Sequence, residues 1–272
     1  MPRLAVLGYP VSHSRSPAMQ NAALEALGLD HEWSYGAIEV PPEGFEEQVR
    51  KLAAGDYAGV NVTVPHKAAA LALADVKVEV AHWVGAANTL VFEGGEITAH
   101  NTDVQGFFHS LPAHLTDLDA LEGRRALVLG AGGAARAVVW KLDGAGAEVD
   151  VWNRTASRAE AMCKDIESDA SPVVAPVQGE YDLIVNTTAV GLRGENPFEH
   201  LPLDRERFDP RQVIVDMAYS DVPSALLTAA EDAGAITVDA IEILVQQGAL
   251  SLEIWTGRQP DLDVMREAAR RR

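Results

Sequence analysis

The sequence has little that would connect it to an oxidising compartment or to a membrane. Only one of its 272 residues, Cys163, is a cysteine, which excludes an internal disulfide and fits a reducing compartment. Cys163 lies in a surface-like helical segment without a basic neighbour, which predicts an inert thiol. No apolar run reaches the roughly 18–20 residues of a membrane span. Residues 1–10 reach glycine and proline too early for a signal peptide. We therefore expect a cytoplasmic protein.

Basic residues are also scarce. The chain has 22 lysines and arginines against 40 aspartates and glutamates, a formal net charge of −18. Such a charge repels nucleic acids and anionic membranes, so neither is an expected partner and a small-molecule substrate is. Because an acid-rich, lysine-poor surface favours solubility at high salt, the composition also predicts a salt-adapted protein.

The residues that are present predict an α/β fold. Hydrophobic residues make up 47% of the chain, and short β-rich runs alternate with alanine-rich helical runs. The length and a looser stretch at residues 112–125 suggest two domains with a connection between them. We place the first domain at residues 1–104 and the second at 105–239, with helices in 240–272 returning to the first.

A glycine-rich turn follows an apolar strand in ALVLGAGGAA, residues 126–135. Gly130, Gly132 and Ala135 match the G-x-G-x-x-G/A pattern between a strand and a helix. Gly130 permits the tight turn, Gly132 lets the backbone approach a pyrophosphate, and Ala135 permits close packing of helix on strand. An ordinary glycine-rich turn is the alternative, and the context favours a dinucleotide site.

The end of the next strand predicts which dinucleotide binds. Asn153, Arg154 and Thr155 follow AEVDVW, with Arg158 one turn later, where an NAD enzyme usually has a carboxylate. A guanidinium there can bind a 2′-phosphate, so we predict NADP rather than NAD. A solvated helix start capped by Thr155 remains the alternative.

A lysine and an aspartate each stand where a strand gives way to a helix. Lys67, in VTVPHKAAA, lies in the first turn of a helix, where the dipole disfavours a cation. Such a broken local rule is expected at functional sites. Asp103, in HNTDVQGF, is at a helix start, where a simple N-cap is the alternative. Together they are a candidate acid–base pair for one alcohol.

Other polar residues stand beside these motifs. Ser14 and Ser16 lie in SHSRSP at the entry to a helix, where Ser16 before a proline also suits a simple cap. Asn88 precedes a predicted strand, and Tyr219 follows one. Gln247 lies in an apolar run, where burial without a hydrogen-bond partner would be unfavourable. The histidines near these motifs lack metal-ligand spacing, so we predict no metal site.

Taken together, the chain resembles the shikimate dehydrogenase family. The motifs SHSRSP, NVTVPHK, GAAN, NTD, GAGGAA, NRT, DMAY and ILVQQGA occur in the family's order over nearly the whole length. The resemblance implies an N-terminal α/β substrate domain, a Rossmann NADP domain, and reversible NADPH-dependent reduction of 3-dehydroshikimate to shikimate. A quinate/shikimate dehydrogenase and a non-catalytic NADP-sensing protein are the alternatives, and the sequence leaves monomer and homodimer open.

The resemblance also implies roles for single residues. Ala240 and Ile243 stand where the family often has glycine and methionine, which puts the local geometry near the nicotinamide in doubt. Lys67 would be the catalytic acid–base, assisted by Asp103, while Ser14 and Ser16 would bind the substrate carboxylate and Thr63, Asn88, Tyr219 and Gln247 its hydroxyls or ring. The cofactor would contact Gly130, Ala131, Gly132, Gly133 and Ala134 at its pyrophosphate, Asn153, Arg154, Thr155 and Arg158 at its adenosine phosphate, and Met217 and Ala240 at its nicotinamide.

Overall fold

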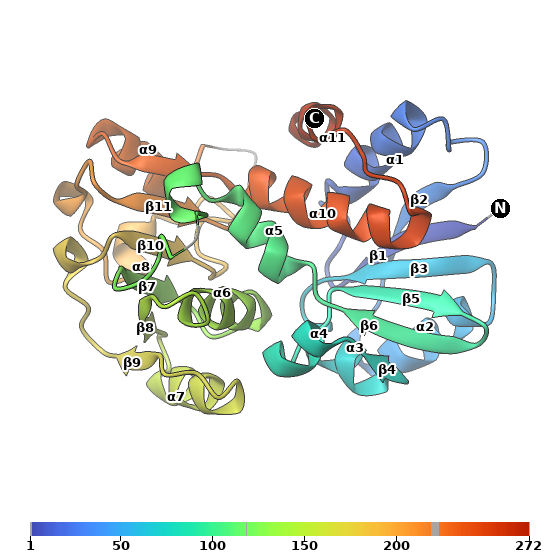
Figure 1. Ribbon diagram of the computed structural model, residues 1–272, viewed down its shortest axis with the longest axis horizontal. Helices are drawn as coiled ribbons and strands as arrows, with labels where there is room; N and C mark the ends of the chain where they lie inside the picture. Colours follow the sequence, from blue (N-terminus) through green and yellow to red (C-terminus); the bar gives the residue numbers. More distant parts are fainter. Residues whose placement is uncertain (1, 118, 219–222, 272) are drawn as a thin grey trace. The chain divides into compact units, whose positions relative to one another are not determined.

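The computed structural model describes residues 2–117, 119–218 and 223–271 (Figure 1). The chain divides into two compact units: unit 1 contains residues 1–106 and 244–272, and unit 2 contains residues 107–243. Both boundaries fall inside helices, one in α5 (Asp103–Ser110) and one in α10 (Ala240–Thr256). Each unit is built on its own six-stranded sheet, so the predicted α/β class is confirmed.

Unit 1 has a mixed sheet with the strand order β2-β1-β3-β5-β6-β4. The pairs β1–β2, β1–β3 and β4–β6 are parallel, whereas β3–β5 and β5–β6 are antiparallel. Besides α10, the elements of this unit are β1 (Arg3–Gly8), α1 (Ser16–Ala26), β2 (Ser34–Glu39), α2 (Phe45–Ala53), β3 (Tyr57–Val62), α3 (Lys67–Leu73), β4 (Val76–Lys77), α4 (Glu79–Val84), β5 (Thr89–Glu93), β6 (Glu96–His100), the start of α5 and α11 (Leu262–Arg270).

Helices cover both faces of this sheet. On one face α2 packs through Phe45 and Val49, one helical turn apart, against Val60 and Val62 of β3. On the other face α1 lies beside α11, and α10 runs past them (Figure 1). Since successive side chains of a strand alternate between faces, Asn61 points away from the valines and towards α10.

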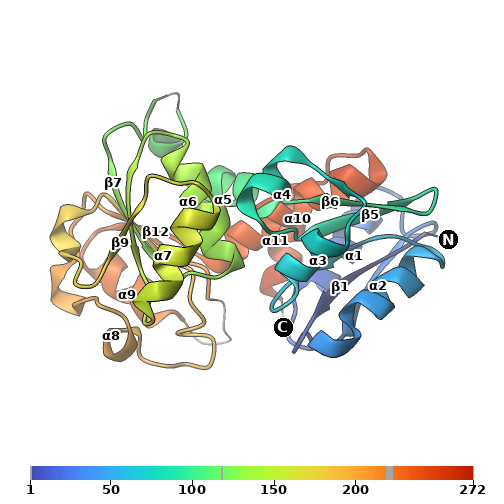
Figure 2. The same ribbon diagram turned by 90° about the horizontal axis from the view of Figure 1, so that it is seen from below.

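Unit 2 has a wholly parallel sheet with the strand order β12-β11-β10-β7-β8-β9. Numbered from β7, this is the 3-2-1-4-5-6 order of a Rossmann fold. Every residue of β10 and β11 is buried, as expected for strands covered on both faces. Its elements, seen from another side in Figure 2, are β7 (Arg125–Leu129), α6 (Gly133–Asp143), β8 (Glu148–Trp152), α7 (Ala156–Asp165), β9 (Ser171–Val173), β10 (Leu183–Asn186), α8 (Pro197–His200), β11 (Val213–Asp216), α9 (Ala225–Asp232) and β12 (Ile236–Val238).

One local prediction was wrong because tertiary packing covers the residues concerned. The stretch suggested as a connection between domains belongs to unit 2, where Leu115 and Leu121 enter the core. Helix α7 has the exposed residues expected of a surface helix, and Cys163 lies on its covered face, buried in the same core. Burial raises the pKa of its thiol, which keeps it protonated and agrees with an inert cysteine.

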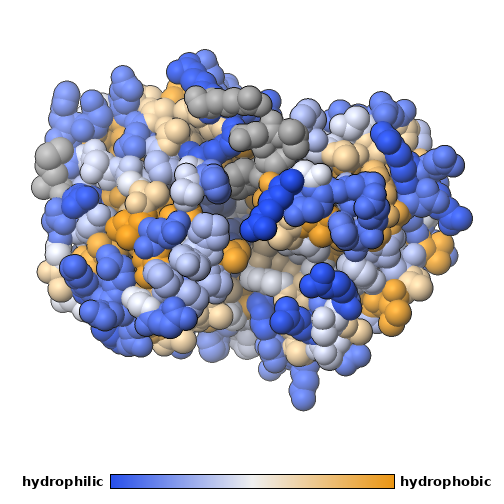
Figure 3. All heavy atoms as spheres, turned by 180° about the vertical axis from the view of Figure 1, so that it is seen from behind, coloured by the Kyte–Doolittle hydropathy of each residue, from blue (hydrophilic) through white to orange (hydrophobic). Residues whose placement is uncertain are grey.

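One face of the surface is mainly hydrophilic (Figure 3). On the face shown in Figure 3, charged and polar residues predominate, and hydrophobic residues gather only in smaller areas between them. Among the helices of the described residues, none is both long and apolar enough to cross a membrane.

Candidate active site

Lys67 and Asp103 form a close ion pair in unit 1. Each is the first residue of a helix, α3 for Lys67 and α5 for Asp103. Lys67 Nζ donates to Asp103 Oδ2 at 2.7 Å, and the two side chains are only 16% and 10% exposed. His66 anchors the start of α3, since its ring stacks on Phe45 and its Nε2 lies 2.7 Å from the carbonyl oxygen of Val40. Lys67 and Asp103, far apart in the sequence, are therefore brought together at one largely buried point.

Asn101, not Asp103, caps helix α5. The Asn101 Oδ1 atom accepts hydrogen bonds from the amides of Asp103 and Val104 at 3.0 and 3.3 Å. The N-cap interpretation of Asp103 is thus wrong, because its neighbour takes that role and leaves the carboxylate available to Lys67. Sequence reasoning missed Asn101, although an asparagine two residues before a helix start is a common capping signal.

Asn88 and Gln247 complete this hydrogen-bonded group. Asn88 Nδ2 donates to Asp103 Oδ1 at 2.9 Å and to Gln247 Oε1 at 3.2 Å. Gly106 permits this arrangement, since a Cβ there would lie 2.5 Å from the Gln247 Cβ and 2.7 Å from its backbone. Glycine at position 106 thus allows α10 to approach α5 closely enough for Gln247 to lie beside the lysine–aspartate pair.

Ser14 and Ser16 lie at the start of α1 in an arrangement that differs from the predicted cap. Arg15 occupies the N-cap position, and Ser16 is the first helical residue. Ser14 Oγ accepts from the Ser16 amide at 3.3 Å, so Ser14 rather than Ser16 provides the local capping acceptor. Ser16 is buried, while Ser14 and Thr63 are half-buried. Gly8 makes room for Thr63, whose Cγ2 would be 2.5 Å from a Cβ at that position.

The glycine-rich turn of unit 2 has the backbone that its sequence predicts. Gly130 has a φ of +117°, which side chains rarely adopt, and a Cβ there would lie 2.5 Å from Thr187 Oγ1. Both the backbone conformation and the lack of space therefore require glycine. Gly132 is the N-cap of α6, where a Cβ would meet no protein atom within 4 Å. No side chain caps this helix. The half-buried Ala131, Gly133 and Ala134 complete a turn whose helix start is open to an anion.

Two cations stand at the β8–α7 corner. Arg154 and Arg158 are exposed, and neither forms an ion pair with the residues that the structure describes. Thr155 is the N-cap residue of α7, but its side chain makes no capping bond. Asn153 shapes the corner by donating to the Thr155 carbonyl oxygen at 2.8 Å. Thr155 therefore has the predicted N-cap position, but its hydroxyl does not cap the helix.

The remaining predicted cofactor residues lie at strand ends of unit 2. Met217 follows β11, donates its amide to the Asn186 carbonyl oxygen at 2.9 Å and packs on the core. Ala240 begins α10 and is buried, and Ile243 enters the unit 2 core. Tyr219, predicted to bind substrate, lies outside the described residues.

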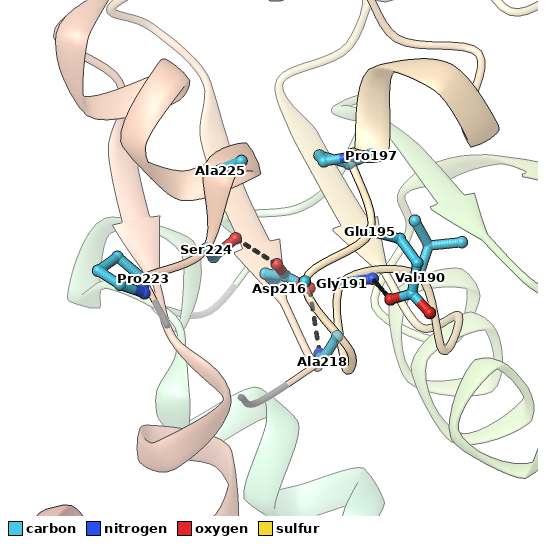
Figure 4. Close-up of a pocket in the computed structure, with 10 residues that line it drawn as sticks. Val190, Gly191, Glu195, Pro197, Asp216, Ala218, Pro223, Ser224 and Ala225 are labelled. Carbon is cyan, nitrogen blue, oxygen red and sulfur yellow. Dashed lines mark hydrogen bonds between the residues drawn. The ribbon is translucent and has the colours of Figure 1, made fainter. Parts of the chain in front are cut away.

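A small cavity of about 60 Å³ lies beside the end of β11 (Figure 4). The Asp216 carboxylate accepts from the Ser224 hydroxyl at 2.5 Å, the Ala218 amide at 3.1 Å and Asn186 Nδ2 at 2.8 Å. Across the cavity, Glu195 accepts from the Gly191 amide. Burial raises the pKa of Asp216. A space this small holds water rather than a dinucleotide, and its polar groups are used in fixing the surrounding loops.

The fold and these sites define a class of protein. A Rossmann unit with an open glycine-rich turn is typical of dinucleotide-dependent enzymes, and a separate α/β unit carries a lysine–carboxylate pair suited to proton transfer. The family models place the chain within this class. The shikimate dehydrogenase substrate binding domain matches residues 6–90, shikimate / quinate 5-dehydrogenase matches 114–244, and the shikimate 5′-dehydrogenase C-terminal domain matches 241–270.

Individual relatives agree. The NADP⁺ shikimate dehydrogenase of Geobacter metallireducens is 42% identical over 97% of this chain and 94% of that protein. That of Symbiobacterium thermophilum is 41% identical over 98% and 92%. The Thermus thermophilus shikimate 5-dehydrogenase, crystallised with NADP(H) and shikimate, is 41% identical with a TM-score of 0.87 over 99% of both chains. The chain therefore belongs to the shikimate dehydrogenase family.

Proposed function

We propose that this chain catalyses the reversible NADPH-dependent reduction of 3-dehydroshikimate to shikimate. The observation that carries the proposal is the 2.7 Å Lys67–Asp103 pair, with Asn88 and Gln247 hydrogen-bonded around it. We assign the substrate to unit 1 and the cofactor to unit 2. Named relatives with about 40% identity over almost the whole chain support the same assignment.

The residues of unit 2 fit NADP. The uncapped start of α6 offers free amides and the positive end of a helix dipole to a pyrophosphate, and Gly132 leaves the approach open. Arg154 and Arg158 present guanidinium groups, paired with no carboxylate of the described residues, where a 2′-phosphate would lie. Met217 and Ala240 are the residues we assign to the nicotinamide side. When bound, NADPH supplies the hydride that reduces the ketone.

In the proposed mechanism Lys67 moves the proton. Its ammonium, held by Asp103, donates a proton to the substrate oxygen on which negative charge develops, and Lys67 takes the proton back in the reverse direction. Asp103 keeps the ammonium in place and balances its charge. Asn88 and Gln247 stand beside the pair and are placed to hydrogen-bond the ring hydroxyls.

The substrate carboxylate is assigned to the start of α1. Ser14 lies half-buried there, Ser16 follows, and the Ser14 hydroxyl accepts from the Ser16 amide. Two hydroxyls at the positive end of a helix dipole form an anion site even on a chain with a net charge of −18. Thr63 is the third hydroxyl that we assign to this substrate, and Tyr219 stays a prediction.

Quinate is the competing substrate. A quinate dehydrogenase of Corynebacterium glutamicum, solved with NAD, is 27% identical to this chain with a TM-score of 0.85. The test offers shikimate and quinate, each with NADP and with NAD, and follows the absorbance of the reduced nicotinamide. We expect turnover chiefly with shikimate and NADP. Preferential turnover of quinate with NAD would support the competing function, and no turnover with any pair would reject both.

Arg154 and Arg158 are expected to decide cofactor preference. Their replacement by alanine together removes charge-assisted bonds to the 2′-phosphate, so KM for NADP should rise by about 10-fold or more. KM for shikimate, and kcat at saturating NADP, should stay close to wild type. The matched control is Arg211→Ala, an exposed arginine paired with Asp209, which should leave all three constants unchanged. An unaltered ratio of NADP to NAD efficiency in the double variant would contradict the assignment.

Two further predictions rest on composition. The single cysteine supports a cytoplasmic location, and the excess of acidic residues supports adaptation to salt. Because salt screens repulsion among surface carboxylates, the free energy of unfolding should rise with salt. Urea unfolding measured from low to multimolar NaCl checks this, and a flat or falling dependence would count against salt adaptation.

A further inference from the structure

A buried group of polar side chains lies beneath the lysine–aspartate pair in unit 1. Its centre is Asn61 on β3, a polar residue that is only 6% exposed. Its neighbours along the strand, Val60 and Val62, belong to the hydrophobic core. None of the roles assigned above uses Asn61. The other members, each buried, are Tyr35, Asn88, Thr89, Thr102 and Ser251.

The Asp103 carboxylate has a fixed orientation because its two oxygens have different partners. Oδ2 accepts from Lys67, whereas Oδ1 accepts from Asn88 Nδ2 at 2.9 Å. The position of the ammonium therefore depends on which way the Asn88 amide faces. A rotation of that amide would turn an oxygen towards the carboxylate and repel it.

The orientation of Asn88 is in turn set from behind. Its Oδ1 accepts from the Thr102 amide at 2.7 Å and from Thr89 Oγ1 at 3.2 Å. The Thr89 hydroxyl accepts from Asn61 Nδ2 at 3.1 Å, and the same Nδ2 lies 3.1 Å from the Asn88 carbonyl oxygen. Asn61 thus contacts both the main chain of Asn88 and the hydroxyl that holds its side chain.

Asn61 is itself held on the side away from Asn88. Its Oδ1 accepts from the Tyr35 hydroxyl at 2.7 Å, and its Nδ2 donates to Ser251 Oγ on α10 at 3.0 Å. Burial raises the pKa of Tyr35, so the phenol remains a donor. Its single proton goes to Asn61, so β2 fixes the direction of the Asn61 amide oxygen.

We propose that Asn61 is a positioning residue for proton transfer: from the core of unit 1 it fixes Asn88 and thereby the Asp103 carboxylate and the Lys67 ammonium. The expected effect on kcat rests on the proposed function, whereas the expected effect on the position of the Lys67 ammonium does not. The hydrogen bonds reach from Tyr35 on β2 to Lys67, so one buried amide lies between the core of unit 1 and the lysine–aspartate pair.

The test replaces Asn61 with leucine, which has a similar shape and no hydrogen-bonding groups. Displacing the pair should lower kcat about 100-fold and shift its pH profile, with little change in KM for NADP. A second readout needs no substrate. The ¹⁵N signal of Lys67 Nζ, assigned by its loss in Lys67→Met, should move, while the signals of the other lysines stay in place (Lys51, Lys77, Lys141 and Lys164).

Gln212→Met is the matched control. Gln212 is also a buried amide, bonded to the carbonyl oxygens of Gln178 and Tyr181, but it lies in unit 2 just before β11. Its replacement should lower the melting temperature without altering the pH profile or the Lys67 signal. Thr89→Val, which keeps the side-chain shape, should change both readouts in the same direction as Asn61→Leu but less.

The outcomes separate this proposal from the proposed function. If folded Asn61→Leu keeps the wild-type pH profile and Lys67 signal, Asn61 is only structural and the positioning role is overturned. If Asn61→Leu does not fold, Thr89→Val decides by the same two readouts. If the wild type turns over neither shikimate nor quinate, the proposed function fails, while a moved Lys67 signal still supports positioning.

Discussion

Replacing Lys67 with methionine is expected to lower kcat by about 10²–10⁴-fold, the usual contribution of a positioned acid–base group. Methionine keeps an unbranched chain of similar length but carries no proton to donate. The oxygen that gains negative charge as hydride arrives would then have water as its only proton source. Because Lys67 is not assigned to the carboxylate site or to NADP, both KM values should change little.

Lys77→Met provides the comparison for this variant. Lys77 is an exposed lysine of unit 1 on β4, so its loss changes the net charge equally without touching Asp103. Initial rates of shikimate oxidation at several pH values give both kcat and its pH profile. Near-normal turnover by Lys67→Met would remove Lys67 from the proton-transfer role, whereas a loss shared by Lys77→Met would indicate an effect of charge alone.

Gly106→Ala is expected to destabilise the protein and to disturb the site, although alanine is normally the better helix former. In an open helix this change stabilises by about 1 kcal/mol. At Gly106 the new Cβ would lie 2.7 Å from the backbone of Gln247, so one of the two helices must shift. Overpacking of this kind costs about 1–3 kcal/mol. The shift would also lengthen the 3.2 Å bond between Asn88 and Gln247.

Thermal unfolding and shikimate kinetics together check this prediction. A loss of about 1–3 kcal/mol lowers the melting temperature of a chain of this size by several degrees. KM for shikimate should rise because Gln247 moves, while KM for NADP should not. Gly179→Ala is the control, since a Cβ there meets no atom within 4 Å. A Gly106→Ala protein as stable and active as wild type would show that the helices separate freely.

Local sequence rules predicted the cofactor turn well. The requirements at Gly130 are set mainly by its own backbone, because a positive φ admits glycine in almost any surroundings. The strand before it and the helix after it were likewise visible as an apolar run and an alanine-rich run. In contrast, Thr187, which would meet a Cβ at Gly130, comes from another strand end and left no signal near the motif.

Capping was predicted less well, because neighbouring polar residues compete for one helix end. In HNTD both Asn101 and Asp103 are good caps, and the structure gives the cap to Asn101. In SHSRSP the local acceptor is Ser14 and not Ser16. The choice depends on where each strand ends relative to the helix that follows, and a difference of one residue reverses it.

The sequence by itself determined the α/β class, the family and the chemistry of the candidate residues, because periodicity, glycine spacing and charged side chains are properties of short segments. Only the tertiary structure decided that Lys67 meets Asp103, that Gly106 admits Gln247, and that Asn61 lies behind them in the core. Those relations join segments far apart in the chain, and they depend on the angles and distances at which the elements of unit 1 pack. A pattern within one segment carries no record of such distances.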